Sequence, residues 1–163
     1  VGRAGRTLHR LLEEQGFHRG FDYGCANIVR CRPPENRKPS AEEVAQCLPY
    51  LAETIRSARP LAILLVGGTA VSVFCGSGSL ASQIARLRAN GHRSEPGFCH
   101  PDLRTVLETD AAPNLFAMPH TSPLAWNRPG PDGRKWSEWG KEAMVSMALA
   151  LKKRGGGFDA AWG

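Results

Sequence analysis

The sequence predicts a three-layer α/β/α sandwich with a mainly parallel central sheet. Short strand-like runs alternate along the chain with amphipathic segments, and the longest apolar run, residues 61–66, lies between Pro60 and Gly67. A continuous apolar run is typical of a strand buried on both faces of a parallel sheet. Alternating strands and helices are typical of folds in which helices cover both faces of such a sheet.

The first elements have clear boundaries. Residues 6–15 carry Leu8, Leu11 and Leu12 at helical spacing, and Gly16 ends the predicted helix. Residues 23–30 are small, apolar or β-branched and are followed by two prolines, which predicts a strand. Ser40 and Glu43 form a capping-box pattern for a helix that runs to about residue 57.

The later elements follow the same alternation. After the strand at 61–66 we expect a tight turn and a helix, and a further helix at 79–89. Residues 90–113, rich in glycine and proline, predict a loop. A short strand at 114–118, a loop at 121–134 and a helix at 136–153 complete the prediction.

Length and composition indicate one domain. The chain has 163 residues, 42% of them hydrophobic, and we expect residues 1–154 to form the domain and residues 155–163 a flexible tail. Only three strands are predicted, fewer than an open parallel sheet usually has, so we expect that an N-terminal strand is missing from the sequence. The composition excludes a coiled coil, and the longest apolar run is too short for a membrane span.

The positive charge is concentrated in two parts of the chain. Residues 1–40 contain eight basic and four acidic side chains, and residues 120–154 contain seven and three, within a total charge of +6. If these parts fold together they form one basic face, as expected of a protein that approaches phosphates. On charge alone, a basic domain without a nucleic-acid partner explains the data equally well.

Polar residues follow the predicted strands. Residues 27–37 come after one strand, residues 67–69 after the second and residues 120–128 after the third. Ligands of open parallel sheets bind beyond the carboxyl ends of the strands, so we expect a site there. The five cysteines, an odd number spread through the chain, favour a reducing, intracellular compartment over a disulfide framework.

Several of these segments carry a family resemblance. The stretches VGRAG at 1–5, ANIVRCRPPENR at 26–37, CLPYL at 47–51 and HTSPL at 120–124, with Arg128 four residues on, resemble the iron-sulfur, family four-like branch of the uracil-DNA glycosylases. Thr121 stands where the wider superfamily usually has proline. The resemblance implies a uracil-DNA glycosylase-like fold and a DNA-repair hydrolase that acts on DNA containing uracil. It also implies that the protein is a cytoplasmic, bacterial monomer with no membrane partner.

The resemblance also implies roles for individual residues. Such an enzyme flips the base out of the duplex and stabilises it as a leaving anion. Asn27 would bind the uracil edge by its amide, and His120 would donate a hydrogen bond to uracil O2. Leu124 would fill the gap left by the flipped base, and Ser122, Pro123 and Arg128 would contact DNA beside it.

Cys31 and Cys47 match the spacing of the last two ligands of a 4Fe-4S cluster in that branch. The other two ligands of the family lie upstream of this sequence, so the ligand set in the chain is incomplete. A zinc site formed by Cys25, Cys31, Cys47 and a histidine is the alternative, although the sequence contains no CxxC pair.

The family's first signature, with the residue that positions the attacking water, is not in the sequence. We therefore expect the parent protein to be a glycosylase and this chain alone to be impaired or inactive. Two alternatives remain open: a non-catalytic or covalent uracil-DNA binding protein on the same fold, and an enzyme acting on a free nucleobase.

Overall fold

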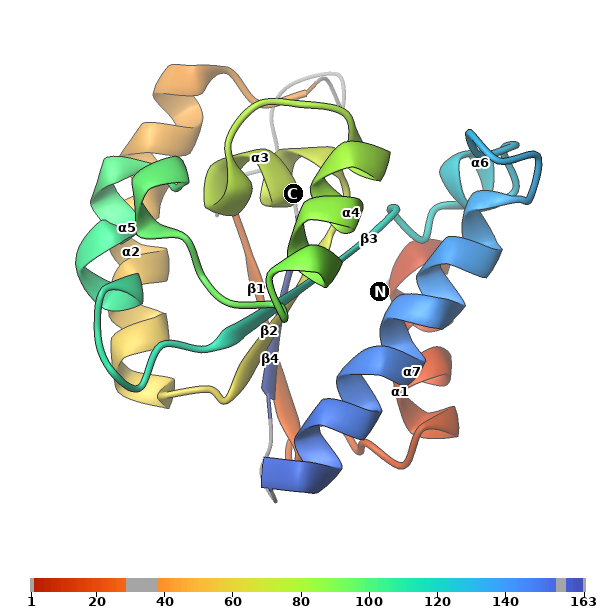
Figure 1. Cartoon of the computed structure of the whole chain (residues 1–163), viewed down its shortest axis with the longest axis horizontal. Helices are drawn as coiled ribbons and strands as arrows, with labels where there is room; N and C mark the ends of the chain where they lie inside the picture. Colours follow the sequence, from red (N-terminus) through yellow and green to blue (C-terminus); the bar gives the residue numbers. More distant parts are fainter. Residues whose placement is uncertain (1, 29–37, 155–157, 163) are drawn as a thin grey trace.

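Four parallel strands form the centre of the molecule, in the order β1-β4-β2-β3 (Figure 1). The computed structural model describes residues 2–28, 38–154 and 158–162. The strands are β1 (Tyr23–Asn27), β2 (Ala62–Val66), β3 (Asn114–Met118) and β4 (Phe158–Trp162). Helices cover both faces, which confirms the predicted three-layer α/β/α architecture.

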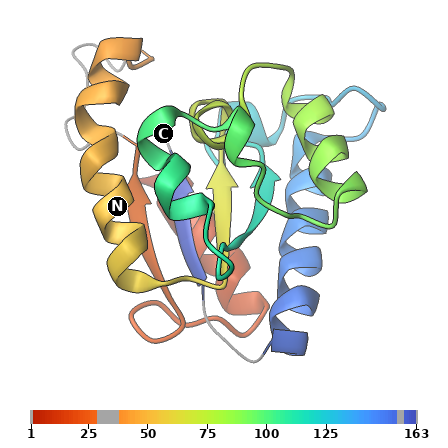
Figure 2. The same ribbon diagram turned by 60° about the vertical axis from the view of Figure 1, so that its left-hand side comes forward.

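The helices divide between two cores. Figure 1 shows α1 (Arg3–Glu14) and α7 (Trp136–Arg154) on one face of the sheet. The other face carries α2 (Ala41–Ala58), α3 (Gly68–Cys75), α4 (Leu80–Ala89) and α5 (Pro101–Leu107), as the turned view in Figure 2 also shows.

The two cores arise from the alternation of side chains along each strand. In β2, Ile63 and Leu65 pack into the core under α2 to α5, whereas Leu64 and Val66 pack into the core under α1 and α7. Because successive residues of a strand point to opposite faces, a wholly apolar strand supplies both cores at once.

The predicted cap of α2 is confirmed. The Glu43 amide donates to Ser40 Oγ at 3.2 Å, and the Ser40 amide donates to the Glu43 carboxylate at 3.0 Å. This reciprocal pair satisfies two amides that the first turn of a helix leaves without partners. The helix ends at Arg59, whose φ of 49° breaks the helical pattern. None of the helices in the described ranges is long and apolar enough to cross a membrane.

Two segments predicted as loops contain helices. The stretch 90–113 includes a 3-10 turn, Pro96–Phe98, and helix α5, and the stretch 121–134 includes the single turn α6 (Pro123–Trp126). In all three a proline occupies the first turn. Proline is well suited to that position because its fixed φ is helical and the amide it lacks would have no partner there. The sequence interpretation treated Pro96 and Pro101 as loop markers and Pro123 as a DNA contact, and it did not identify any of the three as a helix start.

The C-terminal segment differs most from its prediction. Residues 155–163 were expected to be a flexible tail, but Phe158–Trp162 form β4, which pairs with β1 on one side and β2 on the other. The backbone groups of β1 and β2 that face each other are satisfied through this strand. The described sheet therefore has a fourth strand, which the sequence interpretation did not predict, and it lies in the segment expected to be a tail.

The outer edge of β3 is covered by a loop. The Leu115 amide donates to the His92 carbonyl at 2.8 Å, and His92 Nδ1 lies 3.0 Å from the Leu115 carbonyl oxygen. The His92 ring stacks on Phe116 with centroids 4.2 Å apart. Pairing of this kind protects an exposed edge from association with other strands.

Candidate active site

The carboxyl ends of the strands bring the predicted site residues to one edge of the sheet. Asn27 is the last residue of β1, Gly67 follows β2, and His120 lies two residues beyond β3. The Gly67 amide donates to the Met118 carbonyl at 3.0 Å, which joins the second and third of these strand ends. Asn27 is three strand positions from β3, a separation of roughly 14 Å at the usual strand spacing.

His120 is held in one tautomer. The Ser122 amide donates to its Nδ1 at 3.0 Å, so that nitrogen is an acceptor and carries no proton. Burial lowers the pKa of His120 below 6.5, which keeps the ring neutral at pH 7. A neutral ring whose Nδ1 accepts must carry its proton on Nε2. Among the described residues Nε2 has no hydrogen-bond partner, so its N–H is available to a ligand.

Gly67 packs against this ring. A Cβ atom at position 67 would lie 3.4 Å from His120 Cδ2 and 3.5 Å from His120 Cβ, and Gly67 has a φ of +94°. The φ favours glycine, because other residues rarely adopt it, whereas a Cβ would meet the ring only at ordinary van der Waals distance. The imidazole is therefore fixed between the Gly67 backbone and the Ser122 amide.

The loop after His120 is anchored at Thr121. Its side chain is 1% exposed, and its hydroxyl donates to the Ala4 carbonyl of α1 at 2.6 Å. A proline, the usual residue of the superfamily at this position, has no side-chain donor to make this bond. The departure from the family pattern thus gives the loop a tie to the N-terminal helix.

The residues that follow Thr121 differ in exposure, from half-buried Ser122 to exposed Leu124. Leu124 is 76% exposed, and among the described residues only Phe21 is a more exposed large apolar side chain. Ser122 is the N-cap residue of α6, but its hydroxyl makes no capping bond there. Pro123 and Arg128 are exposed, and Arg128 forms no salt bridge with any described residue.

Helix α1 of the first basic part and helix α7 of the second pack together against one face of the sheet (Figure 1), while Arg30, Arg32 and Arg37 of the first part lie outside the described residues. Arg3, Arg6 and Arg10 of α1 are exposed, as are Arg128 and Lys135 in the segment before α7. The hydrogen bond from the Thr121 hydroxyl to the Ala4 carbonyl connects the His120 loop to this face. The arrangement supports the prediction that the positive charge forms one surface.

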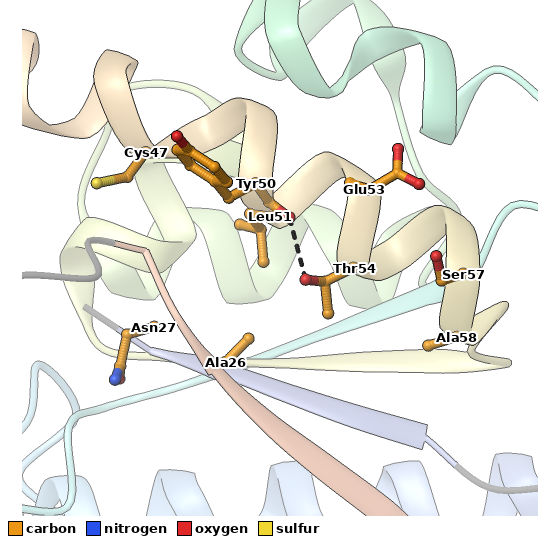
Figure 3. A pocket seen from close by; sticks show the side chains of 9 residues that line it. All are labelled: Ala26, Asn27, Cys47, Tyr50, Leu51, Glu53, Thr54, Ser57 and Ala58. Carbon is orange, nitrogen blue, oxygen red and sulfur yellow. Dashed lines mark hydrogen bonds between the residues drawn. The ribbon is translucent and has the colours of Figure 1, made fainter.

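A second feature of the site edge is an open cleft of about 810 Å³ between β1 and α2. Figure 3 shows Asn27 at its margin, with its amide pointing away from the α2 side chains. Asn27 is exposed, and its amide forms no hydrogen bond with any described residue. His120 does not line this cleft, so the cavity itself does not join the two predicted site residues.

One of the cysteines lies at this cleft. Cys47 is half-buried on α2 and lines the cleft, whereas Cys25 is exposed on β1. Cys31, the other predicted cluster ligand, lies outside the described residues. No group of three histidine, cysteine or acidic side chains that could hold a metal ion occurs in the described parts of the chain.

Sequence reasoning did not identify the packing partners of the site. Gly67 was interpreted only as a turn residue, and the roles of Trp126 and Gly140 were not foreseen. The indole of Trp126 is 8% exposed and packs directly over Gly140 of α7. A tryptophan two residues after an exposed leucine is the signal that could have indicated an anchored turn.

Comparison with known proteins agrees with this geometry. The family model described as "Uracil DNA glycosylase superfamily" matches residues 1–142. The chain is 42% identical over 90 residues to a type-4 uracil-DNA glycosylase of Thermotoga maritima, an alignment that covers 55% of this chain and 45% of that protein. It is 46% identical over 67 residues to the type-4 enzyme of Pyrobaculum aerophilum, covering 41% of this chain and 34% of that protein.

A more extended match is the type-4 uracil-DNA glycosylase of Sulfurisphaera tokodaii, which is 29% identical over 127 residues covering 68% of this chain and 57% of that protein. The chain spans between a third and somewhat over half of the length of these relatives. The family model covers most of the sequence, including both strand ends that carry Asn27 and His120. The chain belongs to the uracil-DNA glycosylase superfamily.

Proposed function

We propose that this protein is a uracil-DNA glycosylase, a base-excision repair hydrolase that cleaves the N-glycosidic bond of uracil in DNA after the base has been flipped out of the duplex. The observation that carries the proposal is the state of His120: a neutral ring, locked by the Ser122 amide, with an N–H donor at the carboxyl edge of the sheet. Membership of the superfamily and the similarity to type-4 enzymes support the substrate.

His120 would act on the leaving base. As the bond between C1′ and N1 breaks, its electron pair passes to the base, and negative charge develops at O2. The Nε2–H of His120 would donate a hydrogen bond to that oxygen and stabilise the anion. Water then adds to C1′ and loses a proton. A neutral donor held in place before the reaction requires no reorganisation in the transition state, which is the source of its catalytic effect.

Asn27 would select uracil. Its amide N–H can donate to O4 while its Oδ1 accepts from N3–H, a pattern that cytosine does not match. The separation of roughly 14 Å between the first and last strands of the sheet leaves room for a pyrimidine and its hydrogen bonds between Asn27 and His120. This is why we assign the two residues to opposite edges of the same base.

DNA would lie along the face that carries Leu124. The exposed leucine would enter the base stack, and Ser122, Pro123 and Arg128 would contact the backbone beside it. The exposed arginines of α1 extend the same surface. We further propose that the protein acts inside the cell, where such DNA is found.

A 4Fe-4S cluster remains a proposal for Cys31 and Cys47. The described residues do not by themselves fit this group, because they contribute Cys47 alone and assemble no set of three ligands. A cluster takes four cysteine thiolates. The catalytic steps above use no iron, and analysis of iron and sulfide in the isolated protein tests the assignment.

The decisive experiment is uracil release from a duplex oligonucleotide by the full-length protein, because we expect this chain alone to be impaired. It is measured under single-turnover conditions, with a mobility-shift assay in parallel. Release of free uracil, lost in His120→Asn, supports a glycosylase. Retention of uracil-DNA without release indicates the binding protein, covalent if the complex resists denaturant. Binding of free uracil that does not depend on salt indicates a nucleobase enzyme, since phosphate contacts make DNA binding strongly salt-dependent.

A further inference from the structure

The turn that carries Leu124 is held in place by one side chain. Helix α6 has only four residues, too few to be stable by its own hydrogen bonds. Two of its side chains differ sharply in exposure: Leu124 is 76% exposed and Trp126 is 8% exposed. Residues two apart on a helix point in nearly opposite directions. The turn therefore presents its leucine outward while its tryptophan is buried beneath it.

Trp126 fits against α7 because residue 140 is glycine. A Cβ atom at position 140 would lie 2.3 Å from Cζ3 and 2.4 Å from Cη2 of the indole, distances that real Cβ contacts do not show. The same position is 3.3 Å from Cε of Met118, the last residue of β3. The indole thus contacts α7 at a point where any side chain would displace it.

Hydrogen bonds within the turn connect the position of Trp126 to that of Leu124. The Trp126 amide donates to the Ser122 carbonyl at 2.8 Å, and Asn127 Nδ2 donates to the Pro123 carbonyl at 2.9 Å. On the other side, the Trp136 amide of α7 donates to the Arg128 carbonyl at 2.9 Å. These bonds leave the turn little freedom once the indole is fixed, so the position of Trp126 determines the position of Leu124.

We propose that Trp126 and Gly140 are positioning residues for the DNA wedge, setting the direction and depth at which Leu124 enters the duplex. The inference rests on the proposed function and deepens it, since neither residue touches the uracil or the reacting atoms. A wedge matters where a flipped base leaves a gap in a stacked duplex. In single-stranded DNA there is no such gap. The pair should therefore affect duplex substrate and leave single-stranded substrate almost unchanged.

The test is Gly140→Ala, a change that by helix propensity alone stabilises a helix interior. Duplex and single-stranded uracil oligonucleotides carry 2-aminopurine beside the uracil, so that fluorescence reports unstacking and base release reports cleavage. We expect the ratio of duplex to single-strand rate, and the duplex fluorescence rise, to fall about tenfold, part of the few kcal/mol that unstacking costs. Leu124→Ala should give the same loss, and the double variant no more.

Two further variants separate the wedge from general damage. Trp126→Phe removes the indole atoms that meet the added methyl group, so combining it with Gly140→Ala should restore most of the duplex preference. Gly97→Ala is the matched control, since a Cβ there meets nothing within 4 Å. It should change neither the ratio nor the fluorescence.

The proposal is overturned if Gly140→Ala lowers both substrates equally, leaves the duplex unchanged, or is not rescued by Trp126→Phe. Hydrogen exchange at the amides of Trp126 and Asn127 should be faster in Gly140→Ala, a readout that needs no DNA. A full-length wild-type protein that neither unstacks nor releases uracil, while the exchange effect is present, refutes the proposed function and the wedge role but not the packing of the indole.

Discussion

Replacing His120 tests whether a fixed neutral donor drives base release. Two conservative changes divide its roles. His120→Asn keeps an acceptor near the position of Nδ1, so the Ser122 amide retains a partner, but it supplies no donor in the place of Nε2. His120→Gln has an amide N–H near the place of Nε2 and loses the acceptor. We expect His120→Asn to fold normally and to lose most of the activity, and His120→Gln to retain more.

The size of the loss follows from the setting of the ring. Removing one preorganised donor costs roughly a hundred- to a thousandfold in rate, about 2.7 to 4 kcal/mol. Gly67 and the Ser122 amide fix the ring before substrate arrives, which favours the full effect, whereas its half-buried position leaves some screening by water. We therefore expect a loss close to the lower limit, about a hundredfold.

The assay is the single-turnover rate of base release from duplex DNA that contains either uracil or 5-fluorouracil. Fluorine stabilises the leaving anion, so a variant without the donor should lose less on 5-fluorouracil than on uracil. Binding of uracil-DNA, measured separately, should change little. An equal loss on both bases would refute electrostatic stabilisation of the leaving group, and an unchanged rate in His120→Asn would refute the role of His120 altogether.

Three other predictions concern selectivity, stability and pH. Asn27→Asp should reduce the preference for uracil over cytosine in parallel release assays. An unchanged preference would contradict the assignment of Asn27 as the residue that selects uracil. Thr121→Val keeps the side-chain shape but loses the 2.6 Å bond to the Ala4 carbonyl, so urea denaturation should show a decrease of about 1 kcal/mol in the free energy of unfolding. Thr54→Val on α2 is the control: it loses the 3.0 Å bond to the Tyr50 carbonyl, but at an exposed position where water replaces it, so its effect should be smaller. The free energy of unfolding should also fall as pH drops below about 6.5, because at that pH the unfolded chain binds protons that the folded chain does not. Urea midpoints measured at about pH 5 and about pH 7.5 test this prediction. A higher midpoint at the lower pH would contradict it. The prediction follows from three histidines whose pKa burial lowers: His9, His92 and His120.

Local sequence signals predicted most of the fold. The capping box at Ser40 located the start of α2, and the apolar run at 61–66 located β2, because both signals act within a few residues. Local sequence signals failed where a contact with residues far away in the sequence determines the secondary structure. Residues 158–162 follow three glycines and have no strong strand pattern of their own, and they form β4 because the edges of β1 and β2 both lack a neighbour without it.

The candidate site was predictable to a similar extent. The family pattern pointed to Asn27 and His120, and the structure places both at the carboxyl edge of the sheet. The contacts that fix His120 were not predictable, since Gly67 lies more than fifty residues earlier in the sequence. Nor could the sequence alone reveal that Trp126 packs on Gly140, because that contact depends on how α6 lies against α7.

The order of the strands has a consequence for how the chain reaches its folded state. β1 pairs with β4, which is the last of the four strands to leave the ribosome and the one that lies between β1 and β2. During synthesis β2 and β3 can pair as soon as both have emerged. β1 has no strand to pair with until β4, which begins at residue 158, has emerged as well. Domains with such distant pairings fold slowly and expose strand edges while they wait. The strand that ends in Asn27 therefore joins the sheet last. In a chain stalled on the ribosome before β4, the strand end that carries His120 could already be in the sheet, while β1 with Asn27 would still be unpaired.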